Sequence, residues 1–354
     1  MAEKIDTCSH CGLPISIGRG NVWHANGVIT ASYPPHNRGT LYDAEELNNL
    51  FPALSERIGF DITRLVIEGK RRDGKRYVDA LLKKLGEVGE LPGNVDIVLM
   101  FHRFITFWGL ALASLEEYLE GESLTLDVKN VYSIPMFEGD VAGMFESLEN
   151  RRGEPDWQGD AEHGLLKVVA VEGEPELEER IEAEVEMGVP FVEEGDLEYR
   201  SCPECGVPQE ISEEFEWDVP NARITEKATG KRFILHNTSG IVAVVRSLRE
   251  ELGEEIESII TEISRQYARD YYGLLKDKSS MDAELIKFPS RSWGRTARLR
   301  RSEDGYRLRM VNPYCTPIVA GRVWGLIEVF EEDDLALEEL TEGDGWVDVI
   351  LGRR

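Results

Sequence analysis

Two Cys-x-x-Cys-Gly segments, CSHCGLP at 8–14 and CPECGVP at 202–208, stand 194 residues apart in this chain. Each segment supplies two thiolate ligands, and its glycine permits the tight turn after the second cysteine. A structural zinc takes four ligands in a tetrahedron, so either segment alone is half of a site. Any fold of this chain has to account for the distance between the two halves.

That distance is explained by a tandem duplication. The same shift of 194 residues carries LSERIGFDI (54–62) onto LREELGEEI (248–256), and a shift of 185 carries Trp108-Gly109 onto Trp293-Gly294. The longest match sets 124–146 onto 306–328 at a shift of 182, with the common pattern N-x-Y-x-x-P-x-x-x-G-x-x-x-G-x-x-E. Common order and small gaps predict a first repeat at 1–172, an acidic linker at 173–198 and a second repeat at 199–354.

Comparing the repeats predicts their elements. Asp43 with Glu46 three residues later has the form of a capping box, which predicts a helix over 44–58. Alternating residues around a Ser-Glu-Asp-Gly turn make 294–311 a hairpin, so the matching segments 109–115 and 124–130 are predicted to be paired strands. Helices are expected to begin at Pro135 and Pro317. The predicted fold class is α+β: two tandem homologous α/β repeats in a pseudo-twofold arrangement, joined by a shared zinc-ribbon-like site.

The four paired cysteines are the predicted metal ligands. The simplest arrangement places Cys8, Cys11, Cys202 and Cys205 around one zinc ion, and four thiolates leave that ion no open position for catalysis. A rubredoxin-like iron centre and a separate site completed by His10 or His24 are the alternatives. The fifth cysteine, Cys315, matches Ser133 in the first repeat and is interpreted as a buried small residue rather than a nucleophile.

Two further features are candidates for binding. In the first repeat, Gly139, Gly143 and Glu146 fall on one face of the expected helix, which implies a close neighbour: either a packed element or a ligand. FHRFITFWG (101–109) gathers aromatic side chains that can wall an apolar pocket. The candidate ligand-binding residues are therefore Phe104, Phe107, Trp108, Tyr132 and Glu146, with Trp293, Tyr314 and Glu328 from the second repeat.

Composition restricts the partners. A formal net charge of −27 and a pI near 4.7 argue against nucleic acid, which needs a local surplus of lysine and arginine. Two basic segments, 69–76 and 291–301, are interpreted as solvated faces or as an anion- or partner-binding patch. No run of eighteen apolar residues and no signal-peptide core occurs, so neither a membrane span nor export is expected, and the expected location is cytoplasmic.

Roughly 55–172 and 245–354 resemble the 4-vinyl reductase (hydrocarbon-binding) domain family. The resemblance rests on an amphipathic helix, a Trp-Gly strand, a hairpin and a Gly-x-x-x-Gly-x-x-Glu helix before a last strand. It implies α/β domains that pair and hold small hydrophobic or aromatic molecules, with the 101–108 cluster and the Glu146 and Glu328 helices bordering the cavity. The chain departs from the phenol-sensing members, because Cys315 stands alone near the C-terminal strands and no output domain is present.

Three functions follow as hypotheses. The first is a non-catalytic, zinc-stabilised pseudo-dimer that binds a small apolar or aromatic ligand. The second is an accessory or assembly protein that docks a protein partner through Arg71, Arg72, Arg291 or Arg295. The third is an enzyme with Glu146 or Glu328 as general acid–base. The six histidines lack ligand spacing, and no known catalytic motif occurs in the sequence.

Overall fold

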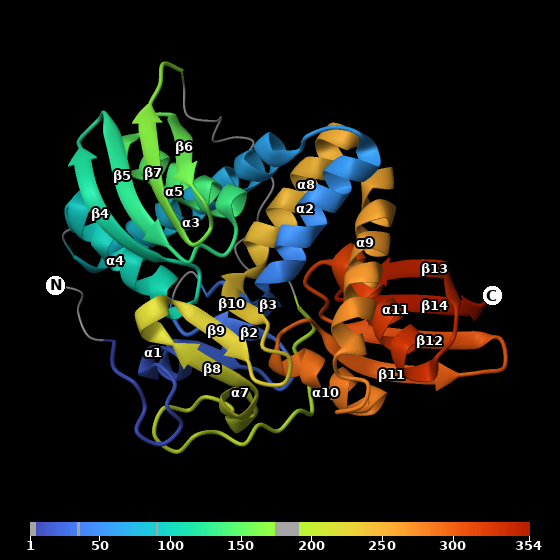
Figure 1. The fold of residues 1–354 in the computed structure, drawn as a ribbon. Coiled ribbons are helices and arrows are strands. Elements are labelled where there is room, and N and C mark those ends of the chain that lie inside the picture. The colour runs from blue at the N-terminus through green and yellow to red at the C-terminus, as the bar shows by residue number, and fades with distance from the viewer. Residues whose placement is uncertain (1–4, 34–35, 90, 174–190) are drawn as a thin grey trace.

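The computed structural model describes residues 5–33, 36–89, 91–173 and 191–354, and it is a mixed fold of helices and antiparallel sheets (Figure 1). The elements of the first repeat are α1 (Ile15–Arg19), β1 (Asn21–Trp23), β2 (Ile29–Ala31), β3 (Arg38–Asp43), α2 (Ala44–Ile58), α3 (Thr63–Val88), α4 (Asn94–Phe107), β4 (Leu112–Leu119), β5 (Ser123–Lys129), α5 (Ile134–Glu149), β6 (Gly153–Gly159) and β7 (His163–Ala170).

The second repeat follows the same succession, with one added 3-10 turn. Its elements are α7 (Gln209–Glu214), β8 (Phe215–Asp218), η1 (Val219–Asn221), β9 (Arg223–Glu226), β10 (Arg232–Asn237), α8 (Thr238–Leu252), α9 (Glu255–Gly273), α10 (Met281–Ser290), β11 (Arg295–Arg301), β12 (Gly305–Val311), α11 (Thr316–Glu331), β13 (Leu335–Gly343) and β14 (Trp346–Arg353).

A six-stranded sheet joins the repeats in the order β1-β2-β3-β10-β9-β8. The antiparallel ladder between β3 and β10 pairs Leu41 with Leu235, Tyr42 with Ile234 and Thr40 with His236. Leu41 and Leu235 are themselves equivalent at the shift of 194, so equivalent residues exchange places across this ladder. A pseudo-twofold axis through the ladder would produce this register; for the rest of the molecule that symmetry stays a prediction.

Each repeat also has its own four-stranded antiparallel sheet. The orders are β4-β5-β7-β6 and β11-β12-β14-β13, and Figure 1 shows them on opposite sides of the molecule. Asn130 and Asn312, the asparagines of the common pattern, both follow the second strand with φ of 53° and 56°. Asparagine tolerates this left-handed conformation better than most residues. The sequence predicted one strand after each Gly-containing helix, whereas the structure has two, a hairpin.

The helices cross between the repeats. α2 leaves the first repeat's strand β3 and packs on α9 of the second, whereas α8 leaves β10 and packs on α3 of the first. The predicted helix over 44–58 is confirmed as α2, and the side chain of Asp43 accepts a hydrogen bond from the Glu45 N–H as an N-cap does. Because of this crossing, each repeat completes the core of the other.

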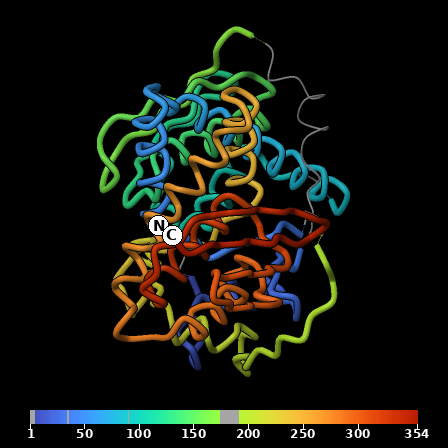
Figure 2. Tube along the Cα trace, turned by 90° about the vertical axis from the view of Figure 1, so that its right-hand side faces the viewer, coloured from blue at the N-terminus to red at the C-terminus, as the bar shows by residue number. Residues whose placement is uncertain are grey.

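The last residues of the linker, 191–198, lie against the folded core. Figure 2 shows the yellow-green segment that follows the grey trace running along one side of the molecule. The Asn26 side chain donates to the Val192 carbonyl oxygen, and the Leu197 N–H donates to the Ala25 carbonyl oxygen. The spacing of Leu177, Ile181 and Val185 predicts a helix over 176–187 in the acidic linker, and that segment lies outside the described residues. Among the described helices, none combines the length and the apolar character needed to cross a bilayer.

Candidate functional site: a four-cysteine cluster and a cavity in the first repeat

The two Cys-x-x-Cys-Gly segments meet, and their four sulfurs lie within 4.8 Å of one another. The Sγ atoms of Cys8 and Cys202 are 3.7 Å apart, and those of Cys11 and Cys205 are 3.6 Å apart. Sulfurs about 2.3 Å from a tetrahedral ion stand about 3.8 Å from each other, so the observed spacing suits a four-thiolate metal site.

The surroundings of the sulfurs act in opposite directions. Backbone N–H groups of Cys205 and Glu204 lower the pKa of Cys202 to about 6, which favours the thiolate that a metal requires, whereas burial raises the pKa of Cys11 and of Cys205, so a metal would have to displace these two protons. Gly12 and Gly206 have φ of +77° and +83°, the left-handed turn that each segment needs. Within the described residues neither His10 nor His24 belongs to the cluster. The cysteines of both repeats thus form one site, and its geometry does not distinguish zinc from iron.

The Gly-x-x-x-Gly face of each repeat packs directly on a helix. A Cβ atom at Gly143 would lie 2.3 Å from the Arg71 carbonyl oxygen, and one at Gly325 would lie 2.5 Å from the Arg265 carbonyl oxygen. The backbones of α5 and α3, and of α11 and α9, therefore approach too closely for any side chain. The packing interpretation of this face is confirmed, and the space leaves no room for a ligand there.

The glutamates that follow these glycines close the same helix pairs. Glu146 Oε1 accepts from Arg71 Nη1 at 2.9 Å, and Glu328 accepts from both Arg265 Nε and Nη2 at 2.8 and 2.7 Å. Both carboxylates are buried, and each also accepts a backbone N–H at the start of the next strand, from Gly153 or Leu335. Such contacts hold the helix against the sheet.

The first basic segment is not a surface patch, whereas in the second segment Arg291 is buried and Arg298, Arg300 and Arg301 are exposed, as a solvated face is. In 69–76, the side chains of Lys70, Arg71, Lys75 and Arg76 are buried and ion-paired on α3, and Arg291 is 1% exposed and paired with Glu226 and Glu214. The expectation that Arg71 and Arg291 offer contacts to a partner is wrong, because a charge run on a long helix can face a neighbouring element as well as solvent. A docking function therefore loses two of its four predicted contacts.

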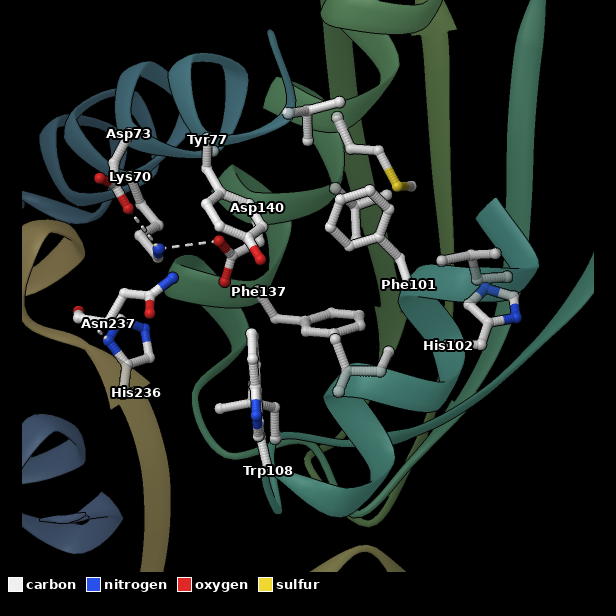
Figure 3. A pocket seen from close by; sticks show the side chains of 17 residues that line it. Lys70, Asp73, Tyr77, Phe101, His102, Trp108, Phe137, Asp140, His236 and Asn237 are labelled. Atoms are coloured by element: carbon white, nitrogen blue, oxygen red, sulfur yellow. Dashed lines mark hydrogen bonds and ion pairs between the residues drawn. The ribbon is translucent and has the colours of Figure 1, made fainter. Parts of the chain in front are cut away.

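A cavity of about 70 Å³ opens in the first repeat between α3, α4, α5 and strand β10 of the second repeat (Figure 3). One end is apolar, with Phe101, Phe137 and Trp108 around it. His102 also lines this end; it is 9% exposed, its Nε2 has no hydrogen-bond partner, and burial lowers its pKa to about 4. The imidazole is therefore neutral at neutral pH.

The other end of the cavity is polar. Lys70 Nζ lies 2.9 Å from Asp73 Oδ2 and 2.8 Å from Asp140 Oδ1. Burial raises the pKa of Asp140, and the Lys70 ammonium opposes this effect. Burial and the charge of Lys70 lower the pKa of His236 to about 3, and its Nδ1 donates to the Asn237 carbonyl oxygen at 2.6 Å. That bond places the imidazole proton on Nδ1 and leaves Nε2 as an acceptor.

A second cavity, of about 260 Å³, adjoins the first toward α1 and β2. Tyr77, Trp108, His236 and Asn237 line both cavities and so form the boundary between them. Phe104 lies on the outer side and stacks on the Trp108 ring at 5.6 Å between centroids, and Phe107 meets the same ring edge-on at 6.0 Å. Together the two cavities reach the lower end of the size range of ligand pockets, about 300 Å³.

The equivalent space in the second repeat is filled by an arginine. Asp140 matches Arg322, whose guanidinium lies 4.0 Å from the Trp293 ring centroid, and Trp293 is the counterpart of Trp108. Arg322 Nε donates to Glu46 Oε2 at 2.7 Å, and both residues are buried. Glu46 therefore takes no part in the expected capping box. Its counterpart is Gly240, where a Cβ would lie only 2.5 Å from Lys70 Nζ.

The structure thus separates the predicted ligand residues into groups. Trp108 lines the cavity, Phe104 and Phe107 line its outer neighbour, and Tyr132 reaches the polar end, where its hydroxyl lies 3.3 Å from His236 Nε2. Trp293 and Tyr314 fill the core of the second repeat, and Glu146 and Glu328 lie at the helix contacts instead. Seven residues that line the cavity were not predicted from the sequence as ligand-binding residues: Lys70, Asp73, Tyr77, Phe137, Asp140, His236 and Asn237.

Some of these misses had a signal in the sequence. Asp140 and Arg322 occupy the same position of the best-matching block, and a charge reversal inside a repeated pattern marks a divergent environment. Tyr77 matches Tyr271 at the shift of 194 residues, but this match by itself does not predict a function for either tyrosine. His236 and Asn237 carried no such signal, because they belong to the other repeat and reach the cavity only through the β3–β10 ladder.

No family model matches the chain, and no curated protein matches it. Among solved structures, the chain is similar to a Cs H-NOX mutant with the unnatural amino acid 4-cyano-L-phenylalanine at site 5, with 14% sequence identity over 34% of this chain and 74% of that chain. The TM-score is 0.26, which is too low to show a shared fold, and this likeness carries no argument about function.

Proposed function

We propose that this chain is a non-catalytic, zinc-stabilised pseudo-dimer that binds one small apolar or aromatic ligand in the cavity of its first repeat. The observation that carries the proposal is the contrast between the repeats. The same scaffold leaves the space beside Trp108 open in one repeat, and in the other it fills that space with the buried Arg322–Glu46 pair. A space kept open in only one of two copies indicates a use beyond packing.

The lining supports an apolar or aromatic ligand. Aromatic side chains offer large apolar surfaces together with a face that attracts positive edges and cations. Such a ligand also agrees with the resemblance to the 4-vinyl reductase family, which remains a proposal. The metal would be held by the four cysteines at the contact between the repeats, with no position left for a substrate, so its contribution is to fold and register.

The test places the arginine and its partners in the open cavity. The variant K70S/D140R/G240E gives the open cavity the side chains that the closed cavity has at the matching positions, namely Ser264, Arg322 and Glu46. We expect this variant to keep its circular dichroism spectrum and its metal content. It should lose every ligand-induced shift in Tm that a panel of apolar and aromatic compounds produces in the parent protein.

The control is Asp127→Asn, which lies on β5 in the same repeat, is ion-paired to His163 and does not line the cavity. This variant should respond to the panel as the parent does. If a compound stabilises the K70S/D140R/G240E variant as strongly as the parent protein, the ligand-binding site lies outside this cavity. If no compound of the panel stabilises the parent protein, the proposed function is wrong.

A further inference from the structure

The filled cavity of the second repeat indicates which chemical group the open cavity of the first repeat can hold. The Arg322 guanidinium is planar and lies over Trp293, and the rings of Tyr42, Tyr267 and Tyr271 have their centroids 5.7–5.8 Å from it. A cation over an aromatic face is attracted by the ring quadrupole, and a guanidinium also stacks through its flat surface. The scaffold is thus shaped for a flat, nitrogen-bearing group at this point.

Two of the four rings around Arg322 have counterparts at the open cavity. Trp108 is the counterpart of Trp293 and Tyr77 is the counterpart of Tyr271, and both line the space. The ring contacts of Trp108 are with Phe104 and Phe107. In place of the arginine the chain has Asp140, whose carboxylate lies between Lys70 and Tyr77 in Figure 3. Part of the aromatic surface is therefore kept, although Asp73 matches Tyr267 and His236 matches Tyr42, and the planar cation is replaced by a carboxylate that would pair with one.

The Tyr132 hydroxyl is shared between two acceptors at the polar end. Tyr132 Oη lies 3.4 Å from Asp140 Oδ2 and 3.3 Å from His236 Nε2, and it has only one proton to donate. Lys70 uses Asp140 Oδ1 and Asp73 Oδ2, while Arg76 pairs with Asp73 Oδ1. The Tyr132 hydroxyl can therefore serve only one of its two acceptors at a time, and the Asp140 side chain, which is 26% exposed, can accept a further hydrogen bond from a ligand.

We infer that the ligand of this cavity carries a planar N–H donor group, such as an amidine or an aromatic amine, which stacks on Trp108 and donates to Asp140 Oδ2. The inference rests on the proposed function and specifies the chemistry of its ligand. The apolar remainder of the ligand extends past Trp108 toward Phe104 in the outer cavity, because the inner cavity of about 70 Å³ holds only part of a substituted ring.

Three probes of the same shape test this inference by isothermal titration calorimetry: benzamidine, benzoate and the hydrocarbon α-methylstyrene. A charge-assisted hydrogen bond to a carboxylate predicts that benzamidine binds at least about tenfold more tightly than α-methylstyrene. Benzoate should not bind measurably. Asp140→Asn should remove the advantage of benzamidine, whereas the control Asp127→Asn should retain it.

Tyr132→Phe gives a second test, independent of any loss of stability in the Asp140 variant. Removing this hydroxyl takes away the donor that competes with the ligand, so benzamidine should bind as tightly as to the parent protein or more tightly. Weaker binding to Tyr132→Phe would overturn the inference. Equal binding of benzamidine and α-methylstyrene, unchanged by Asp140→Asn, would overturn it while leaving the proposed function intact. Failure of all three probes, and of the wider apolar panel, would overturn both.

Discussion

Substituting Arg322 tests whether its ion pair with Glu46 is what closes the second repeat. Arg322 is 0% exposed and Glu46 is 1% exposed, and Arg322 Nε donates to Glu46 Oε2 at 2.7 Å. Glu46 Oε1 has no hydrogen-bond partner, so this carboxylate depends on the arginine. Arg322→Met keeps most of the side-chain length but leaves a buried charge unpaired, and the expected loss is about 3–5 kcal/mol in the free energy of unfolding.

The matching change in melting temperature follows from the size of the chain. With an unfolding entropy of about 2.1 cal/mol/K per residue over 354 residues, Tm should fall by roughly 4–7 °C if the molecule unfolds as one unit. Glu46→Leu alone should cost a similar amount. The double variant, which removes both charges, should lie within about 1–2 kcal/mol of the parent, because an apolar pair of similar volume replaces a buried ion pair at little cost.

Chemical denaturation of the four proteins gives the coupling free energy between the two sites. Additive losses, or a loss below about 1 kcal/mol for Arg322→Met, would refute the view that this pair closes the cavity. The smaller double variant E46A/R322A adds a functional readout, because it should open a second cavity beside Trp293. An apolar compound that binds the parent once should then bind twice per chain.

The remaining predictions concern the metal, the helix contacts and pH. Cys202→Ser should abolish all bound metal, measured by elemental analysis after dialysis, and retention of half would show two separate sites. Gly143→Ala should lower the free energy of unfolding by about 1–3 kcal/mol, because the added Cβ would lie 2.3 Å from the Arg71 carbonyl oxygen. The control Gly86→Ala, whose Cβ would meet nothing nearer than 3.9 Å, should raise the free energy of unfolding by up to about 1 kcal/mol. Equal effects of the two substitutions in thermal unfolding would contradict this account. Burial and then Asp156 raise the pKa of Glu138 to about 7 from its ordinary 4.5, so the folded protein binds this proton more tightly than the unfolded chain, and the stability should fall as pH rises from about 5 to 8. Glu138→Gln should remove on the order of 1 kcal/mol of that fall, and an unchanged pH profile of denaturation midpoints would contradict the assignment.

Local patterns predicted much of the fold. Helix α2 has the bounds that the sequence predicted from Asp43 and Glu46, and α3 runs through Gly69 and Gly74, where its counterpart α9 is also helical. The two Cys-x-x-Cys-Gly segments meet as the duplication predicted. These features were accessible because short-range spacing determines which side chains share a face and how many ligands a turn can supply.

Other features depended on which elements pack together. Glu46 has the spacing of a capping box, yet it pairs with Arg322, 276 residues away. The basic run of α3 looked solvated, yet Lys70 and Arg71 are buried, because α5 and α8 cover that helix. A sequence pattern shows that a charge recurs on a face, but the partner that desolvates it belongs to another element.

The sequence by itself predicted that the chain is built from two related units, that the four paired cysteines come together where they could hold a metal ion and that a glycine face implies a close neighbour. Only the tertiary structure decided that the cavity is open in the first repeat and closed in the second. That decision rests on His236, Asn237 and Gly240 on one side, and on Tyr42 and Glu46 on the other. The physical reason is the crossing of the repeats, which gives each cavity a wall from the opposite half of the chain, so no pattern within one repeat could report what fills it.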